Sequence, residues 1–164
     1  MSVYRLIVLV HVLSALAFVM AHGISMMMMF KVQRERKYEN LCNYLDISSA
    51  ALRPAMLALH GIELSGIILT IMGGWWRMGW IWISLLLFLA VGVVMAKYAA
   101  GYMNSVRRAM GMVSEKDLKK GIRPAPAPQE VLLEVVAAGQ PKKVASLALS
   151  GMAMIVALMV MKPF

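Results

Sequence analysis

Apolar residues fill four long stretches of this 164-residue chain, and the charged residues gather in the loops between them. The first stretch, residues 6–30, contains no Lys, Arg, Asp or Glu. The others are residues 53–72, 79–100 and 144–161. About 18 apolar residues in a row are enough to cross a bilayer as a helix. The pattern therefore predicts an all-α fold, an integral membrane four-helix bundle in a single domain.

The third loop, residues 105–141, carries a second kind of pattern. Apolar positions within residues 129–138 recur at helical spacing, and Gly139 follows them. This predicts a short amphipathic helix on the cytoplasmic surface. Its apolar positions are Val131, Leu132, Val135 and Val136.

Small residues recur every four positions on three of the stretches. Such spacing lets helix backbones approach closely, which favours helix association where lipid surrounds the protein. We expect these positions to lie at helix contacts within the chain or between subunits. They are Ala17, Ala21 and Ser25, then Gly92, Ala96 and Ala100, then Ser146 and Ser150.

Charge placement predicts the orientation of the bundle. Of 17 Lys and Arg residues, only Arg5, Arg77 and Lys162 fall on one side of a four-span arrangement. Basic residues accumulate on the cytoplasmic side of membrane proteins, so both termini are expected outside. The net charge of +9 is thereby explained without a nucleic-acid partner. The expected partners are the lipid bilayer and other membrane subunits or further copies of the chain.

Composition narrows the function classes. The chain is 61% apolar and 15% charged, against about 25% charged in soluble domains. This excludes a soluble enzyme. The single cysteine, Cys42, excludes an internal disulfide and a cysteine metal cage. No phosphate-binding loop, catalytic triad or zinc spacing is present, so the residues identify no independent catalytic activity.

All three histidines fall within the apolar stretches, where ionisable groups are costly and usually functional. His11 and His22 share one face of the first helix, within an arc of roughly 80°. Arg53, His60 and Glu63 share one face of the second. Because the two helices are consecutive and antiparallel, we expect their polar faces to meet.

Depth then suggests a cofactor. Counted from the outer end at about 1.5 Å per residue, His11 lies at about 8 Å, His60 at about 18 Å and His22 at about 24 Å. A b-type haem needs two imidazoles on facing helices at similar depth. His60 with His22 or with His11 meets this requirement. Glu63, at about 14 Å, would orient an imidazole or carry a proton, and Arg53, at about 28 Å, would pair with a propionate.

Three other interpretations remain open. The polar residues can act only as hydrogen-bonding contacts between helices, in a structural or assembly subunit without a cofactor. Copper is a weaker alternative, because His22, Met26 and Met29 share a face and thioether suits Cu(I). Quinone binding is the third. Most of the 17 methionines are expected to be packing residues.

Four local motifs stand out along the first two thirds of the chain. They are His11-Val12-Leu13-Ser14-Ala15, Ala21-His22-Gly23-Ile24-Ser25, Gly73-Gly74-Trp75-Trp76-Arg77-Met78-Gly79-Trp80-Ile81-Trp82 and Val106-Arg107-Arg108-Ala109-Met110-Gly111. Together they resemble a bacterial family of predicted integral membrane proteins, domain-of-unknown-function family 2269. The resemblance covers roughly residues 1–111 and implies four spans in a bacterial cytoplasmic membrane, without an assigned activity. A weaker similarity, at the histidine early in the first helix, connects the chain to copper-resistance and haem-binding membrane proteins.

Overall fold

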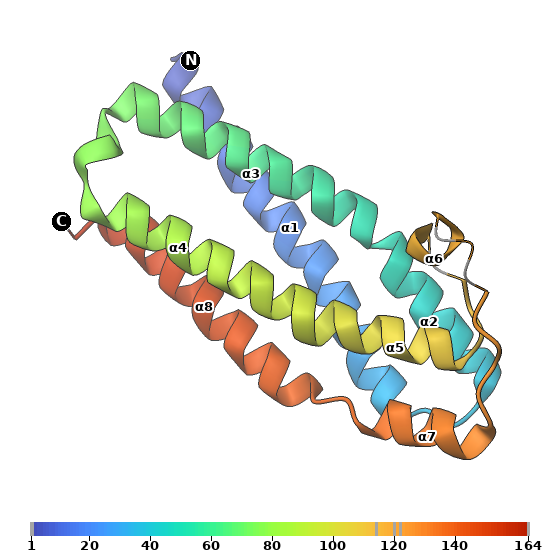
Figure 1. Cartoon of the computed structure of the whole chain (residues 1–164). Helices are drawn as coiled ribbons and strands as arrows, with labels where there is room; N and C mark the ends of the chain where they lie inside the picture. Colours follow the sequence, from blue (N-terminus) through green and yellow to red (C-terminus); the bar gives the residue numbers. More distant parts are fainter. Residues whose placement is uncertain (1, 114, 120, 122, 164) are drawn as a thin grey trace.

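Four long helical stretches run the length of the molecule in a computed structural model of the chain (Figure 1). The structure describes residues 2–113, 115–119, 121 and 123–163, and these contain helices and turns but no strand. The four stretches long and apolar enough to cross a membrane are Val3–Arg34, Tyr38–Gly73, Gly79–Ala109 and Gln129–Met161. The expected all-helical fold with four long apolar helices is confirmed.

The first two stretches extend beyond the expected apolar segments. Helix α1, Val3–Arg34, has 32 residues and is about 48 Å long, more than a hydrocarbon layer of about 30 Å. Helix α2, Tyr38–Ala50, lies where the sequence predicts a loop, and α3, Leu52–Gly73, follows it directly. Pro54 has no N–H to donate to the carbonyl of residue 50, which interrupts the helical hydrogen bonds between α2 and α3.

The second half of the chain is similarly continuous. Helix α4, Gly79–Val94, passes through a π-helical turn, η2, Met95–Ala100, into α5, Gly101–Ala109. Two short helices, α6 (Glu115–Lys119) and α7 (Gln129–Ala137), lead to α8, Pro141–Met161.

Helix α7 corresponds to the predicted amphipathic helix. Its Leu132 and Val136 side chains are buried in the apolar core formed with α1, α2 and α5. The protein itself therefore covers part of the apolar face, whereas Val131 is exposed. The position of this helix on the cytoplasmic surface stays a prediction.

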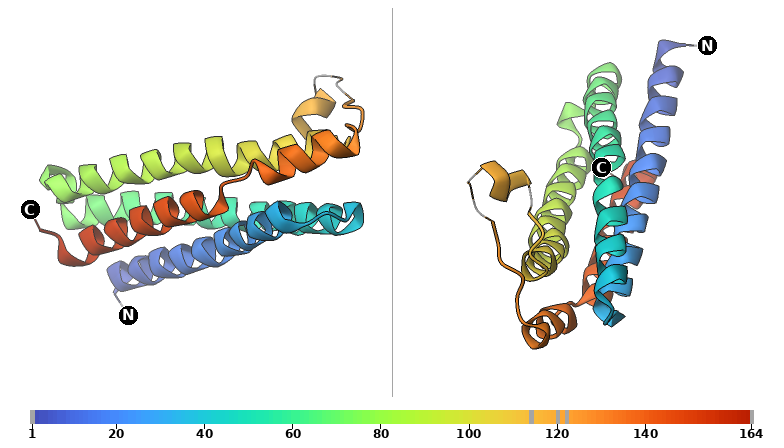
Figure 2. Two further views of the ribbon diagram at one scale, coloured as in Figure 1. Left: turned by 90° about the horizontal axis from the view of Figure 1, so that it is seen from below. Right: turned by 90° about the vertical axis from the view of Figure 1, so that its right-hand side faces the viewer.

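The long helices form two antiparallel pairs, α1 with α3 and α4 with α8 (Figures 1 and 2). In the second pair, the backbone of Gly151 lies against the side chain of Val91. Only Ala21 among the predicted small-residue positions is buried, and Ser25 is half-buried. The exposed ones are Ala17, Gly92, Ala96, Ala100, Ser146 and Ser150.

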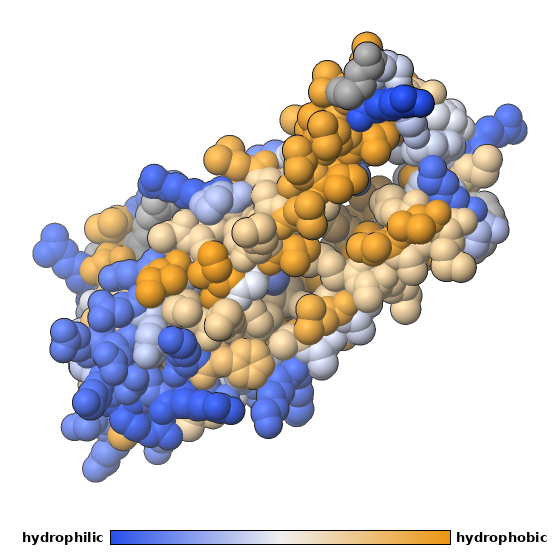
Figure 3. All heavy atoms as spheres, turned by 180° about the vertical axis from the view of Figure 1, so that it is seen from behind, coloured by the Kyte–Doolittle hydropathy of each residue, from blue (hydrophilic) through white to orange (hydrophobic). Residues whose placement is uncertain are grey.

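The apolar core lies at the end of the molecule opposite the two termini, which we call the basic end. Val32, Leu41, Leu45, Val106 and Val136 are fully buried there, on helices α1, α2, α5 and α7. Polar side chains link the same helices. The Arg107 guanidinium donates to the Leu45 carbonyl oxygen at 2.7 Å, and the Tyr102 hydroxyl donates to the Val136 carbonyl oxygen at 2.7 Å. Figure 3 shows most of the hydrophilic residues of the visible face gathered at this end and apolar ones over the middle of the molecule.

The opposite end is aromatic and carries both termini (Figure 1). Helix α3 ends at Gly73. The capping residue Gly74 has a φ of +66°, which suits glycine, and the short helix η1, Trp75–Arg77, follows. The Tyr4 ring meets the Trp75 ring edge-on at 6.5 Å. The Lys162 ammonium lies 4.0 Å from the centre of the Trp75 ring. One tryptophan thus joins the first helix, the turn and the last helix.

Candidate functional site

His11 lies in the contact between α1 and α3. Its Nδ1 is 2.9 Å from the hydroxyl oxygen of Ser65, which is buried. The Ser65 hydroxyl also makes a short hydrogen bond to the Gly61 carbonyl, four residues earlier. Because a hydroxyl has only one hydrogen, we assign Nδ1–H of His11 as the donor to Ser65. His11 is therefore held by its own helix pair.

Glycines bring the two backbones together on either side of this hydrogen bond. A Cβ at Gly61 would collide with the Ser14 side chain. A Cβ at Gly66 would lie 3.4 Å from Cε1 of His11. Gly61 and Ser65 are four residues apart, the small-residue spacing typical of close helix contacts in membranes. This contact fixes both the register and the rotation of α3 against α1.

The polar face of α3 does not meet α1, contrary to expectation. Arg53, His60 and Glu63 are exposed, whereas Ala55, Ala58 and Ser65, which lie along the same part of α3, are buried. Leu69 and Thr70, near the end of the helix, are buried as well. Ala55, Ala58 and Ser65 lie on roughly the opposite side of the helix from Arg53, His60 and Glu63 at 100° per residue. Small residues give α1 a closer approach than the bulky polar side chains allow, so the polar face is turned outward.

His60 and Glu63 pair with each other on that outward face. His60 Nδ1 is 3.2 Å from Oε2 of Glu63, and the two side chains are 61% and 46% exposed. In the part of the chain that the structure describes, Nε2 of His60 has no hydrogen-bond partner. The pair consequently presents a free imidazole nitrogen to the surroundings.

The helix register also changes the predicted depths. Gly61 contacts Ser14, so His60 lies about 10 Å along the helix axis from the level of His22 and about 6 Å from that of His11. The sequence estimate favoured His22 instead. Since His60 also points away from α1, the structure brings it together with neither histidine.

The remaining predicted residues are separate from one another. His22 stacks on Phe18 of its own helix, with ring centres 5.5 Å apart. Arg53 is exposed in the first turn of α3 and makes no ion pair within the described residues. Met29 is buried in the core at the basic end, as expected of a packing residue. No cluster of three or more His, Cys, Asp or Glu side chains suited to a metal occurs among the residues described.

Sequence reasoning missed the residues that make the helix contact: Ser65, Gly61 and Gly66. Ser14, which meets Gly61 from α1, was noted as part of a local motif, without a partner. The available signal was the pair of small residues at positions 61 and 65, four residues apart in an apolar helix.

Comparisons with protein-family models, with curated proteins and with solved structures found no match to this chain. The family resemblance noted above therefore stays a prediction. The class that the fold itself defines is an all-helical protein with four long apolar helices.

We predict that the α1–α3 contact fails when a large side chain enters it. Gly61→Leu should lower the free energy of unfolding by about 1–3 kcal/mol, because overpacking forces the helices apart. Gly23→Leu is the matched control, since a Cβ at Gly23 has no atom within 4 Å. Thermal unfolding followed by circular dichroism measures both. Equal destabilisation by the two changes would contradict the close contact at Gly61.

Proposed function

We propose that this chain is an integral membrane protein with four spans and both termini outside, in a bacterial cytoplasmic membrane. The four long apolar helices support insertion. By sequence, only Arg5, Arg77 and Lys162 among the 17 basic residues belong to the side that carries the termini, which supports this orientation by the positive-inside rule. The aromatic cluster at the other end suits a membrane interface.

Cysteine labelling in intact cells tests the orientation. In a Cys42→Ser background, Arg77→Cys should react with a membrane-impermeant maleimide added outside. Lys119→Cys should react only after the membrane is permeabilised. Both positions are exposed in the fold, so access to the reagent depends on sidedness. The reverse labelling pattern would invert the orientation.

We further propose that the chain is a subunit of a membrane complex and assembles through the outward face of α3. The single observation that carries this proposal is the exposed His60–Glu63 pair near the middle of a 22-residue apolar helix. Ionisable side chains in a membrane normally face protein or water, because contact with lipid is costly. The extensive helix contacts of α3 in this chain are with α1, on the opposite side.

A partner helix would satisfy this face. A second copy of the chain, inserted in the same direction, places its own His60 and Glu63 at the same depths as those of the first copy, within one helical turn of each other. Another subunit with a polar intramembrane residue would serve as well. In either case the pair gains hydrogen bonds within protein that it lacks in contact with lipid.

Substitutions on α3 test the assembly. The double change His60→Leu with Glu63→Leu should weaken association about 5- to 30-fold, the equivalent of about 1–2 kcal/mol for polar contacts between helices. The single chain should remain folded, because leucine is compatible with lipid. Glu63→Gln keeps a hydrogen-bonding group and should retain more of the assembly than Glu63→Leu.

The assembly measurement is cross-linking in membranes together with light scattering of the purified protein. Leu86→Ala on α4, which also trims an exposed side chain, is the control and should leave assembly unchanged. Undiminished assembly in the His60→Leu, Glu63→Leu double variant would remove α3 as the interface.

Haem b binding for electron transfer is the second candidate, favoured by the geometry of His60. A carboxylate on Nδ1 and a free Nε2 form the arrangement by which proteins orient metal-ligating histidines. His60 would thus be the residue by which this chain holds the haem iron. The other ligand would come from the partner, for instance from His60 of a second copy at the same depth. Bound haem would supply one-electron transfer.

Absorption spectra test the haem proposal. The purified complex should show a dithionite-dependent α-band, and His60→Ala should abolish it. His11→Ala and His22→Ala should keep the band, because both side chains lie on α1 and away from His60. Loss of the band in His22→Ala would indicate a ligand pair within one chain, and a colourless wild-type complex would contradict haem binding altogether.

A further inference from the structure

A pocket of about 370 Å³ lies between the last turn of α1 and the first turn of α8, at the basic end of the molecule. Gln33 and Arg34 line it from α1, and the chain from Gly139 to Lys143 lines it from the other side. The Gln33 side-chain amide donates to the Gly139 carbonyl oxygen and fixes the two walls together. The pocket is thus formed by two segments distant in sequence.

Three cations meet in this pocket without a counter-ion. Arg34, Lys142 and Lys143 line it, and no acidic residue does. None of the three forms an ion pair in the described part of the chain. Like charges brought together repel one another, so the arrangement favours an anion between them.

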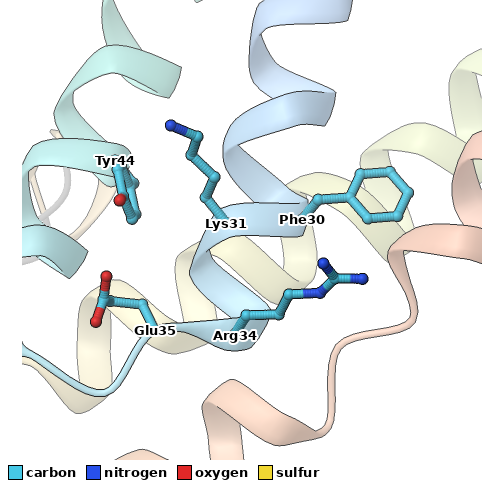
Figure 4. A pocket seen from close by; sticks show the side chains of 5 residues that line it. All are labelled: Phe30, Lys31, Arg34, Glu35 and Tyr44. Atoms are coloured by element: carbon cyan, nitrogen blue, oxygen red, sulfur yellow. The ribbon is translucent and has the colours of Figure 1, made fainter.

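In the neighbouring pocket, drawn in Figure 4, the charged groups of Glu35 and Lys31 already have interaction partners. There the Glu35 carboxylate accepts hydrogen bonds from the backbone N–H groups of Lys37 and Arg36 and from the Asn40 side chain. These bonds lower the pKa of Glu35 below its ordinary value. The Lys31 ammonium lies 5.2 Å from the centre of the Tyr44 ring. Arg34 extends to the other side, away from Glu35.

The start of α8 adds hydrogen-bond donors. The helix begins at Pro141, and the first N–H groups of any helix have no carbonyl partner within it. Those of Lys142 and Lys143 belong to residues that line the pocket. The positive end of this 21-residue helix therefore acts together with the three side chains.

Apolar side chains border the cations on the side facing the middle of the helices. Phe30 lies one turn before Arg34 and projects to the same side of α1 (Figure 4). Leu147 lies one turn after Lys143 on α8 and is 49% exposed. A cationic pocket beside apolar helix surface matches an amphiphile with a phosphate head and acyl chains.

We propose that this pocket binds the phosphate of an anionic glycerophospholipid from the leaflet at the basic end. The proposal rests on the membrane insertion proposed above, but not on assembly through α3 or on haem. Basic pockets between helices on the cytoplasmic side are suited to anionic headgroups, and each interfacial cation adds about 1 kcal/mol of attraction.

Lipid competition tests the site. The full chain is purified in detergent, mixed with equal amounts of phosphatidylglycerol and phosphatidylcholine, and examined by native mass spectrometry. The wild-type protein should retain phosphatidylglycerol preferentially. The triple change Arg34→Gln, Lys142→Gln and Lys143→Gln should reduce that preference about tenfold or more.

A matched control separates the pocket from the overall charge. Arg36→Gln, Lys37→Gln and Lys119→Gln remove the same charge from the same end but line neither pocket. An equal loss in this control would overturn the proposal. Displacement of the lipid by excess inorganic phosphate would reassign the pocket to a free phosphate.

Alkaline carbonate extraction of membranes distinguishes the two levels of failure. If the chain is extracted as a peripheral protein, membrane insertion and the lipid site both fail. If it stays in the membrane but shows no preference for phosphatidylglycerol, only the lipid site fails.

Discussion

The close contact between α1 and α3 determines how the chain presents its chemistry. Gly61 lets Ser14 reach the backbone of α3, and Ser65 holds His11 beside it. A helix can turn only one side to its neighbour. With small residues on that side, the ionisable residues of α3 must point elsewhere, and the outward position of His60 and Glu63 follows directly from this packing.

The two ends of the molecule are stabilised by different forces. At the basic end, side chains such as Leu41 and Val106 are removed from water, and hydrogen bonds such as that of Arg107 link separate helices. Along the apolar length, the helix pairs depend on backbone approach, as at Gly61 and Gly151. Figure 3 shows a hollow between the outer halves of α1 and α8, so the two helix pairs are joined chiefly at the basic end.

Hydropathy predicts the long helices well, because burial in lipid requires an uninterrupted apolar run. The expected segment 53–72 differs from α3 by one residue at each end. Helix α2 was missed, since its buried residues, Leu41 and Leu45, are few and lie among charged ones. A segment in which polar residues predominate gives only a weak indication that it packs into an apolar core.

The candidate site was predicted in its residues but not in its geometry. Periodicity shows that His60 and Glu63 share a face, but it does not say which neighbour that face meets. The face of α3 that packs against α1 is the one that allows the shorter distance between the helix axes. The small residues at 58, 61 and 65 form that face. The periodicity of a single helix does not show which of its faces will pack against the neighbouring helix.

The contacts of Tyr4 and Lys162 with the Trp75 ring have a consequence for the evolution of such chains. Tyr4 and Lys162 both lie against this one ring, so the beginning and the end of the fold are neighbours. An even number of long helices returns the chain to the side where it started. Two copies joined in tandem would therefore need only a short connector and no additional helix, and every helix would keep its direction. Gene duplication and fusion could produce an eight-helix protein from this fold in one step.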